Sequence, residues 1–290
     1  MNTFANDPIR AGLWMMGAVV SFTLMAVAGR EVLDELDTFE VMMYRSFLGI
    51  CIVLIFSKSA GTVNEINLQQ LTLHLTRNIT HFIGQNLWFF AVTAITLPQL
   101  FAFEFSVPIW VALFAPIFLS EKLTKRRLFA ALIGFFGILI VARPDNIGVT
   151  PGIIAAALCA MCFTGTGIAT KLLTRTQSIT CILFWLTVMQ AILGIICAGY
   201  DFDISFPSRG NLPWVILIGL AGLLAHFCIT KALQLADAIV VYPMDFVRLP
   251  LATGVGVLFY NEPIQLLVFV GAAIILGANF LNIISEKQNP

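Results

Sequence analysis

The stretch LPQLFAFEFSVPIWVALFAPIFLSEKLTKRR, residues 97–127, decides the fold class. It begins as a continuous apolar run interrupted by one carboxylate, Glu104, and four of its last six residues are basic. The run has none of the alternation that a membrane-facing barrel strand shows. Because backbone polar groups in hydrocarbon must pair within their own segment, the stretch predicts a membrane-spanning helix that ends at a charged surface.

The same bias extends over the whole chain of 290 residues, of which 59% are hydrophobic and 11% charged, with a mean hydropathy of +0.93. Soluble domains carry about 25% charged residues, so this composition excludes a water-soluble enzyme. Sixteen basic residues balance sixteen acidic ones. With no net charge to attract a polyanion, nucleic acid is not expected as a partner, and we expect an all-α membrane protein surrounded by lipid.

Ten apolar segments predict transmembrane helices, since one span needs about 20 residues. Short polar loops join them, and none is long enough to fold by itself. The predicted spans are residues 11–28, 41–56, 78–95, 99–119, 128–142, 153–171, 179–198, 212–232, 238–260 and 266–284.

The distribution of lysine and arginine predicts the orientation, because cytoplasmic loops carry an excess of both. With the N-terminus cytoplasmic, eleven basic residues fall in inside loops and three in outside loops, so both termini are expected in the cytoplasm. Arg77 is counted at the inside boundary, where its side chain is expected to extend to the interface. The eleven are Arg10, Lys58, Arg77, Lys122, Lys125, Arg126, Arg127, Lys171, Arg175, Lys231 and Lys287, and the three are Arg30, Arg143 and Arg209.

An internal repeat emerges when the sequence is aligned with itself at an offset of 141 residues. Each half, 9–143 and 151–284, holds five predicted spans. Because five is odd, the second half enters the membrane from the opposite side, which predicts ten transmembrane helices in two inverted five-helix repeats. Secondary transporters use this architecture and bind substrate where the halves meet. The aligned polar pairs are Gln85 with His226, Glu104 with Asp245, and Glu121 with Glu262.

Two carboxylates, Glu104 and Asp245, lie inside predicted spans, where an ionised group costs at least about 2.5 kcal/mol. They are candidates to line a central cavity, to bind a cationic part of a substrate, or to take up a proton. The alternative is a structural carboxylate with an internal partner. For Asp245 the two interpretations are balanced, because Arg248 is three residues away on the same predicted helix. Glu104 has no basic residue within one turn, which favours a role in the cavity.

Prolines in the same two spans predict interrupted helices, because each removes a backbone donor. Interruptions at corresponding positions of two halves indicate the binding site of a transporter. These residues are Pro98, Pro108 and Pro116 on or beside the fourth span, and Pro243 and Pro250 in the ninth.

The third span carries a polar stripe in which Arg77, His81 and Gln85 are four residues apart and Trp88 follows three residues later. These side chains share one face of a helix and must point toward other helices or water. His226 is the counterpart of Gln85 in the second half. Either histidine could relay protons, since imidazole titrates near neutral pH. The alternative is a histidine that is hydrogen-bonded between helices.

Arg45, in the second span, is a candidate to hold a substrate carboxylate, because its planar guanidinium matches two carboxylate oxygens. The alternative is an internal partner such as Glu104 or Asp245, and the sequence does not choose between them. Cys159 and Cys162 have no second ligand pair, so no metal site is expected. We also expect no catalytic residue and no cofactor.

Two segments resemble the ends of EamA-type repeats. LSEKLT (119–124) precedes a glycine-rich span that ends in VARP (141–144), and YNEPI (260–264) precedes a span that contains Gly271 and Gly277. On these motifs the chain resembles the drug/metabolite transporter superfamily in its ten-span form. The resemblance implies a location in the cell inner membrane and the transport of amino acids, other metabolites, vitamins or S-adenosylmethionine.

We therefore expect a secondary transporter that moves a small amino-acid-like, aromatic or zwitterionic metabolite by alternating access. The resemblance also implies an alternative, an uptake carrier for a vitamin or cofactor such as riboflavin or S-adenosylmethionine. An intramembrane enzyme is a remote third hypothesis, since the sequence lacks the H-E-x-x-H motif. Proton coupling, the direction of transport, and a monomeric or homodimeric state are left open.

Overall fold

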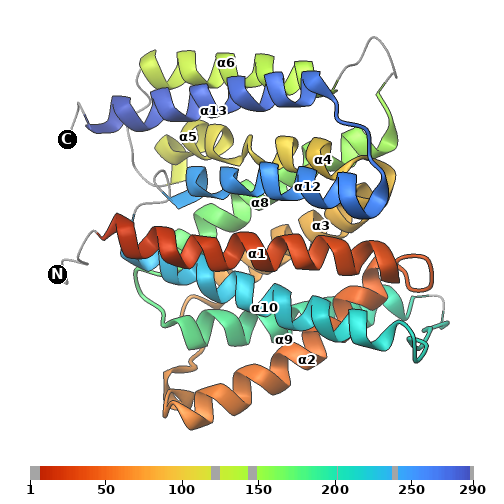
Figure 1. The fold of residues 1–290 in the computed structure, drawn as a ribbon. Coiled ribbons are helices and arrows are strands. Elements are labelled where there is room, and N and C mark those ends of the chain that lie inside the picture. The colour runs from red at the N-terminus through yellow and green to blue at the C-terminus, as the bar shows by residue number, and fades with distance from the viewer. Residues whose placement is uncertain (1–6, 119–124, 143–148, 201, 237–240, 288–290) are drawn as a thin grey trace.

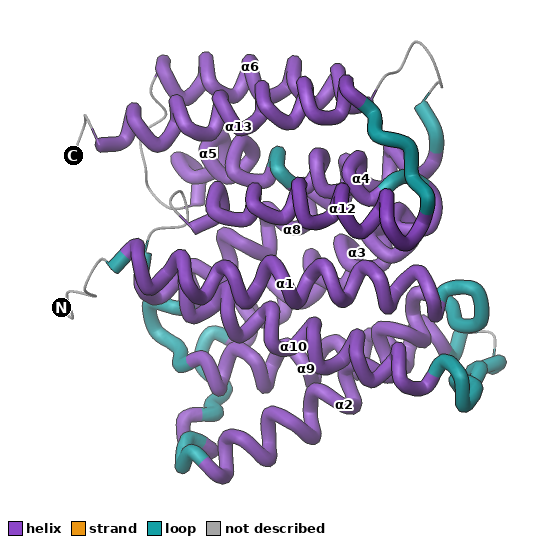
Figure 2. Tube along the Cα trace, in the orientation of Figure 1, coloured by secondary structure: helices purple, strands orange, loops and turns teal. Residues whose placement is uncertain are grey.

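The computed structural model describes residues 7–118, 125–142, 149–200, 202–236 and 241–287, and within these ranges the chain is helical without strands (Figure 1, Figure 2). The predicted all-α fold class is confirmed. The helices are α1 Pro8–Val32, α2 Thr38–Ser59, η1 Val63–Glu65, α3 Leu71–Ala94, α4 Leu97–Glu104, α5 Val107–Phe118, α6 Lys125–Ala142, α8 Pro151–Leu173, α9 Ile179–Ala198, α10 Leu212–Leu235, η2 Tyr242–Val247, α12 Arg248–Tyr260 and α13 Leu266–Lys287.

Five helices, α1, α2, α8, α9 and α10, are long and apolar enough to cross a membrane. They coincide with five of the ten predicted spans. α3 is of similar length, but its buried face is rich in polar side chains, which lowers its hydropathy. The fourth and ninth predicted spans are each divided into shorter pieces. The helix lengths and composition are those of a multi-pass membrane protein.

Both predicted interruptions are confirmed. The fourth span is broken between α4 and α5, just before Pro108. Proline has no N–H group, so the Glu104 carbonyl four residues earlier loses its α-helical donor. In the ninth span, the 3-10 segment η2 precedes α12 and contains Asp245. Each break therefore lies beside one of the two carboxylates.

The offset of 141 residues also relates the helix boundaries. It carries the first residues of α2, α3, α5 and α6, at 38, 71, 107 and 125, onto 179, 212, 248 and 266, where α9, α10, α12 and α13 begin. The packing of the helices shows the same relation. α1 packs against α10, and α8, the counterpart of α1, packs against α3, the counterpart of α10. The two halves thus meet through equivalent pairs of helices.

Two pairs of helices related by the offset run antiparallel, α2 with α9 and α6 with α13. Gly194 of α9 lies against Met43 of α2, and Thr187 lies against Gly49, so these two helices are antiparallel. A Cβ at Gly194 would lie 2.9 Å from the Met43 Cα, so glycine is needed for this approach. Close contacts give α6 and α13 the same antiparallel relation, and the two form one layer at the edge of the molecule (Figure 1).

Candidate functional site

A cavity lies between the two broken spans and the central helices α1, α3, α8 and α10. Seven of the eight predicted site residues line it, and Arg45 does not. The seven are His81, Gln85, Trp88, Glu104, His226, Asp245 and Arg248, and the rest of the lining is Phe22, Met25, Arg77, Phe105, Val107, Phe163, Thr166, Gly167, Thr170, Ile229, Leu233 and Tyr242.

Arg248 joins the two carboxylates. Its Nη2 is 2.6 Å from Glu104 Oε2 and also pairs with Asp245. The indole N–H of Trp88 donates to the other oxygen of Glu104. The Phe101 ring covers the guanidinium, with its centroid 4.4 Å from the Arg248 Cζ. Glu104 therefore has both predicted properties, since it lines the cavity and has an internal partner that sequence spacing did not reveal.

This cluster has more acidic than basic groups. Two carboxylates share a single guanidinium, so either the cluster holds an excess negative charge or one carboxyl group carries a proton. Asp245 Oδ1 and Arg248 Nε are buried and have no protein hydrogen-bond partner. The cluster can therefore attract a cation or exchange a proton without losing the Arg248 pairing.

Two histidines, His81 and His226, form another part of the lining. The His81 and His226 rings meet edge to face with centroids 4.6 Å apart, and His81 also stacks on Phe163 at 5.9 Å. Both His81 nitrogens, His226 Nε2 and Gln85 Nε2 are buried without a protein partner. Buried polar atoms normally have hydrogen bonds, so these atoms are available to a ligand or to water in the cavity.

Arg77 also lines the cavity, and the expectation that it extends to the membrane surface is wrong. Its side chain is only 1% exposed. Nε donates to the Thr170 hydroxyl at 2.7 Å, and Nη1 lies 3.4 Å from Asn78 Oδ1. α3 begins at Leu71, so Arg77 lies in its second turn, and Thr170 of the neighbouring α8 faces it. Among the described residues, no carboxylate pairs with Arg77.

Arg45 is buried outside the cavity. Its Nη1 lies 3.8 Å from the sulfur atoms of Met25 and Met42. Glu104 and Asp245, the internal partners offered as the alternative for Arg45, pair with Arg248 instead. Arg45 lines a small separate pocket between α2, α9 and α10.

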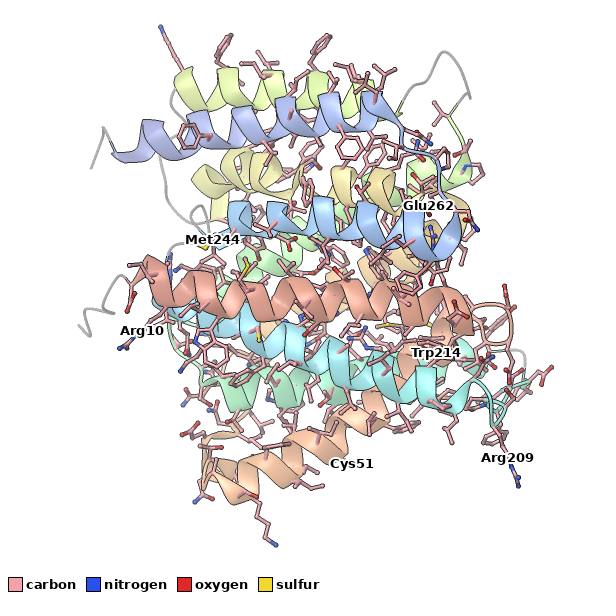
Figure 3. All side chains as sticks on the ribbon, viewed as in Figure 1. Arg10, Cys51, Arg209, Trp214, Met244 and Glu262 are labelled. Atoms are coloured by element: carbon pink, nitrogen blue, oxygen red, sulfur yellow. The ribbon has the colours of Figure 1, made fainter. Side chains whose placement is uncertain are left out.

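Arg30 ties together three segments at one end of the molecule, a role that the sequence did not suggest. Its Nη1 is 2.5 Å from Glu262 Oε1, and its Nε and Nη2 donate to the carbonyls of Val92 and Ile95 at 2.8 and 3.0 Å. The guanidinium also stacks on Tyr260, 4.6 Å from the ring centroid. Figure 3 shows Glu262 at the opposite end of the helices from the N-terminus.

Lys171 makes the equivalent contacts at the other end. Its Nζ donates to the carbonyls of Leu233 and Ala236, each at 3.2 Å. The offset of 141 converts residues 30, 92 and 95 into 171, 233 and 236, so both basic residues bind the C-terminal carbonyls of equivalent helices. Alignment of Arg30 with Lys171 at that offset is the signal that could have revealed them. Glu121, the counterpart of Glu262, lies outside the described residues.

Comparisons with known proteins agree with this arrangement. The EamA-like transporter family matches residues 9–143 and 150–284. An S-adenosylmethionine uptake transporter of Rickettsia felis is 24% identical over 98% of this chain and 97% of its own. Riboflavin transporters of Rhizobium johnstonii and Brucella anthropi are 27% and 31% identical, over 99% and 71% of this chain and 96% and 74% of theirs. One protein crystal structure matches 97% of this chain and 99% of its own with a TM-score of 0.71; its 16% identity bears on the fold alone.

Proposed function

The chain belongs to the EamA-like transporter family, and from this premise we propose that it takes up a cationic or zwitterionic metabolite that carries a flat heterocycle. S-adenosylmethionine is the first candidate. It combines the amino-acid-like, aromatic and zwitterionic properties expected from the sequence. The observation that carries the proposal is the central cavity, which two groups of side chains line together. One is the acidic cluster of Glu104, Asp245 and Arg248. The other is the histidine wall of His81 and His226, whose ring nitrogens include unpartnered ones.

The proposed topology is ten transmembrane helices in two inverted repeats, 9–143 and 151–284, in the inner membrane with both termini cytoplasmic. The repeated helix boundaries and the antiparallel relation of α2 and α9 support the inversion. The excess of lysine and arginine in the inside loops supports the orientation. In such an arrangement the substrate site lies near the membrane midplane, where the halves meet.

The acidic cluster favours a substrate with positive charge. A sulfonium or ammonium group near Asp245 would balance the carboxylate charge that Arg248 leaves over. The charge interacts strongly because Glu104 is buried and only 17% of the Asp245 side chain is exposed. A neutral substrate leaves that charge unbalanced unless a proton remains on one carboxyl group.

The histidine wall favours a heterocycle with ring nitrogens and an exocyclic amine. His81, His226 and Gln85 offer hydrogen-bonding atoms that no protein group uses. Phe163 and Phe22 provide ring faces beside the histidines. Adenine matches this combination, because its edge both donates and accepts hydrogen bonds and its face stacks on aromatic rings.

Riboflavin is the second candidate. Relatives named riboflavin transporters support it, and its flat ring system suits the same wall. It carries no positive charge to balance the acidic cluster. For that reason we rank it after S-adenosylmethionine.

Alternating access requires that the two ends of the cavity close in turn. We assign the closed outer end to Arg30, which holds α1, the end of α3 and Glu262 together. Lys171 is the equivalent residue for the inner end. Exchange of a proton at the acidic cluster for the cationic substrate would couple uptake of the substrate to outward movement of a proton, so a proton gradient directed outward would drive it.

The test is uptake of radiolabelled S-adenosylmethionine by the purified protein in proteoliposomes. We expect saturable uptake that unlabelled S-adenosylmethionine inhibits more strongly than riboflavin. Liposomes without protein are the control. Uptake no greater than in empty liposomes overturns S-adenosylmethionine as the substrate, and stronger inhibition by riboflavin reverses the ranking of the two candidates.

A further inference from the structure

We propose that Arg77 binds the carboxylate of the transported molecule, so that the carrier selects metabolites with an amino-acid carboxyl group over their decarboxylated forms. The inference rests on the proposed function, because it takes the central cavity to be the substrate site. It assigns the anionic end of the substrate to a residue that the sequence had placed at the membrane surface.

The first argument is the state of the Arg77 side chain. It is 1% exposed and lines the cavity. Thr170 holds Nε at 2.7 Å, and Asn78 is next to Nη1. A guanidinium has five N–H donors in a rigid plane. Nη2 has no hydrogen bond to any described residue, so part of the plane is fixed in orientation and still available to a ligand.

The second argument is charge. Arg77 has no carboxylate partner among the described residues, and a buried charge without a partner is unfavourable. Within the cavity lining, Glu104, Asp245 and Arg248 already form their own cluster. Arg77 is a separate positive charge in the same cavity. A zwitterion balances both the excess negative charge of the cluster and the positive charge of Arg77, with its cation near Asp245 and its carboxylate on Arg77.

The third argument is position. Tyr242 begins η2 three residues before Asp245, and its hydroxyl reaches α8, where a Cβ on Gly167 would lie 2.2 Å from it. Gly167 is one turn from Thr170, which orients Arg77. Tyr242 thus brings the segment that carries Asp245 against the part of α8 that holds Arg77, so one extended ligand can contact both.

The other buried arginines are less suitable. Three arginines are buried in the described part of the chain: Arg45, Arg77 and Arg248. Arg248 is occupied by two carboxylates, and Arg45 lies against methionine sulfurs outside the cavity. Arg77 alone among them lines the cavity without a carboxylate.

The experiment compares acids with the corresponding amines, using thermal shifts and competition binding on the purified full-length protein. The probes are S-adenosylmethionine, methionine and phenylalanine, each paired with its decarboxylated amine. In the wild type we expect the acid of each pair that binds to have at least about tenfold higher affinity than its amine. The reason is that only the acid can form a charge-assisted, hydrogen-bonded pair with Arg77. Arg77→Gln should reduce the ratio to about one through loss of acid binding, with little change for the amine.

Arg45→Gln is the matched control, because it also removes a buried arginine but not one in the cavity; its acid-to-amine ratio should equal that of the wild type. If Arg77→Gln does not fold, Thr170→Val replaces it, since it frees the guanidinium and should lower the ratio. An unchanged ratio in the folded Arg77→Gln or Thr170→Val protein overturns the proposal, as does a wild type with no preference for the acid in any pair. If only the methionine or phenylalanine pair discriminates, S-adenosylmethionine fails as substrate while the role of Arg77 stands.

Discussion

Arg248 on α12 binds Glu104 on α4 with an Nη2–Oε2 distance of 2.6 Å, across 144 residues of sequence. The pair joins the two broken spans at the cavity, and Asp245 shares the same guanidinium. Any movement that separates the broken spans must therefore rearrange this cluster. Stability and transport are thus expected to depend on the same three residues.

Arg248→Met should destabilise the protein by about 3–5 kcal/mol, because it leaves the buried Glu104 and the partly buried Asp245 without a counter-charge. Thermal unfolding in detergent measures the effect. The control is the triple variant Arg248→Met, Glu104→Gln, Asp245→Asn, which removes all three charges and should recover most of the lost stability. If the single variant unfolds at the wild-type temperature, the cluster does not contribute as described.

Glu104→Gln should fold but lose uptake driven by a pH gradient. The amide can still accept from Trp88, and Asp245 continues to balance Arg248, so the structure remains satisfied. The excess carboxyl group that could carry a proton is gone. Two assays in proteoliposomes separate proton coupling from substrate binding: gradient-driven uptake depends on both, and substrate counterflow needs no proton gradient. Glu104→Asp is the control. Unchanged gradient-driven uptake would rule out Glu104 as the proton carrier.

Much of the fold could be predicted because it depends on local sequence. The apolar runs predict the helices, and Pro108 predicts the break beside Glu104 because a missing N–H acts within one turn. The offset of 141 residues, found by aligning the sequence with itself, also maps the first residues of four helices onto the first residues of four others. These features need no knowledge of which helices are neighbours in space.

The pairing of side chains could not be predicted in the same way. Arg248 reaches Glu104 from another helix, and no spacing rule reports such a contact. Arg77 was misplaced because the apolar pattern begins at residue 78, whereas α3 begins at Leu71. Polar residues in its first two turns are buried against α8 and α9, so hydropathy marks the wrong boundary. Arg30 is likewise assigned to a loop from sequence because the predicted span ends at residue 28, whereas α1 continues to Val32.

His81→Phe should weaken binding of an adenine-bearing ligand about tenfold, since it keeps the ring that stacks on Phe163 and removes two nitrogens. His74→Phe is a closely matched control. His74 is also on α3, is fully buried, and has two unpartnered nitrogens, but it packs against Trp185 outside the cavity, with the two rings tilted by 44°. Competition binding measures both variants. Equal losses of affinity would indicate a general effect on α3.

The loop that follows α1 should loosen in acid. Ser208 donates its backbone N–H and its hydroxyl to Glu35, and Asn211 donates its amide, which lowers the pKa of Glu35 below its usual 4.5. A carboxyl group with a lowered folded-state pKa stabilises the contact above pH 4.5, and that contribution is lost as the pH falls through the folded value.

Hydrogen exchange of the segment around Ser208, corrected for intrinsic rates, tests this dependence. Protection should be constant near neutral pH and decrease below pH 4.5. Glu35→Gln should show reduced protection already at neutral pH and little further change in acid. The same acid dependence in this variant would exclude Glu35 as the titrating group.

Arg30→Gln and Lys171→Gln should shift access to the cavity in opposite directions. Arg30 holds the carbonyls of Val92 and Ile95 at the end of α3, and Lys171 holds the equivalent carbonyls at the end of α10. Removal of either donor weakens the closed form of its own end and leaves the other intact. Arg30→Gln therefore favours the state that is open at the Arg30 end, and Lys171→Gln favours the state that is open at the Lys171 end.

The measurement is the labelling rate of a cysteine introduced at Thr96, beside the Arg30 contacts, with the exposed Cys51 and the partly exposed Cys162 and Cys197 replaced by serine. Labelling should be faster than in the parent for Arg30→Gln and slower for Lys171→Gln. Arg10→Gln is the control, because Arg10 is 76% exposed in its pair with Asp7 and such surface pairs contribute at most about 1 kcal/mol. A change in the same direction for both variants would contradict the assignment of Arg30 and Lys171 to opposite gates, since only opposed ends respond with opposite sign.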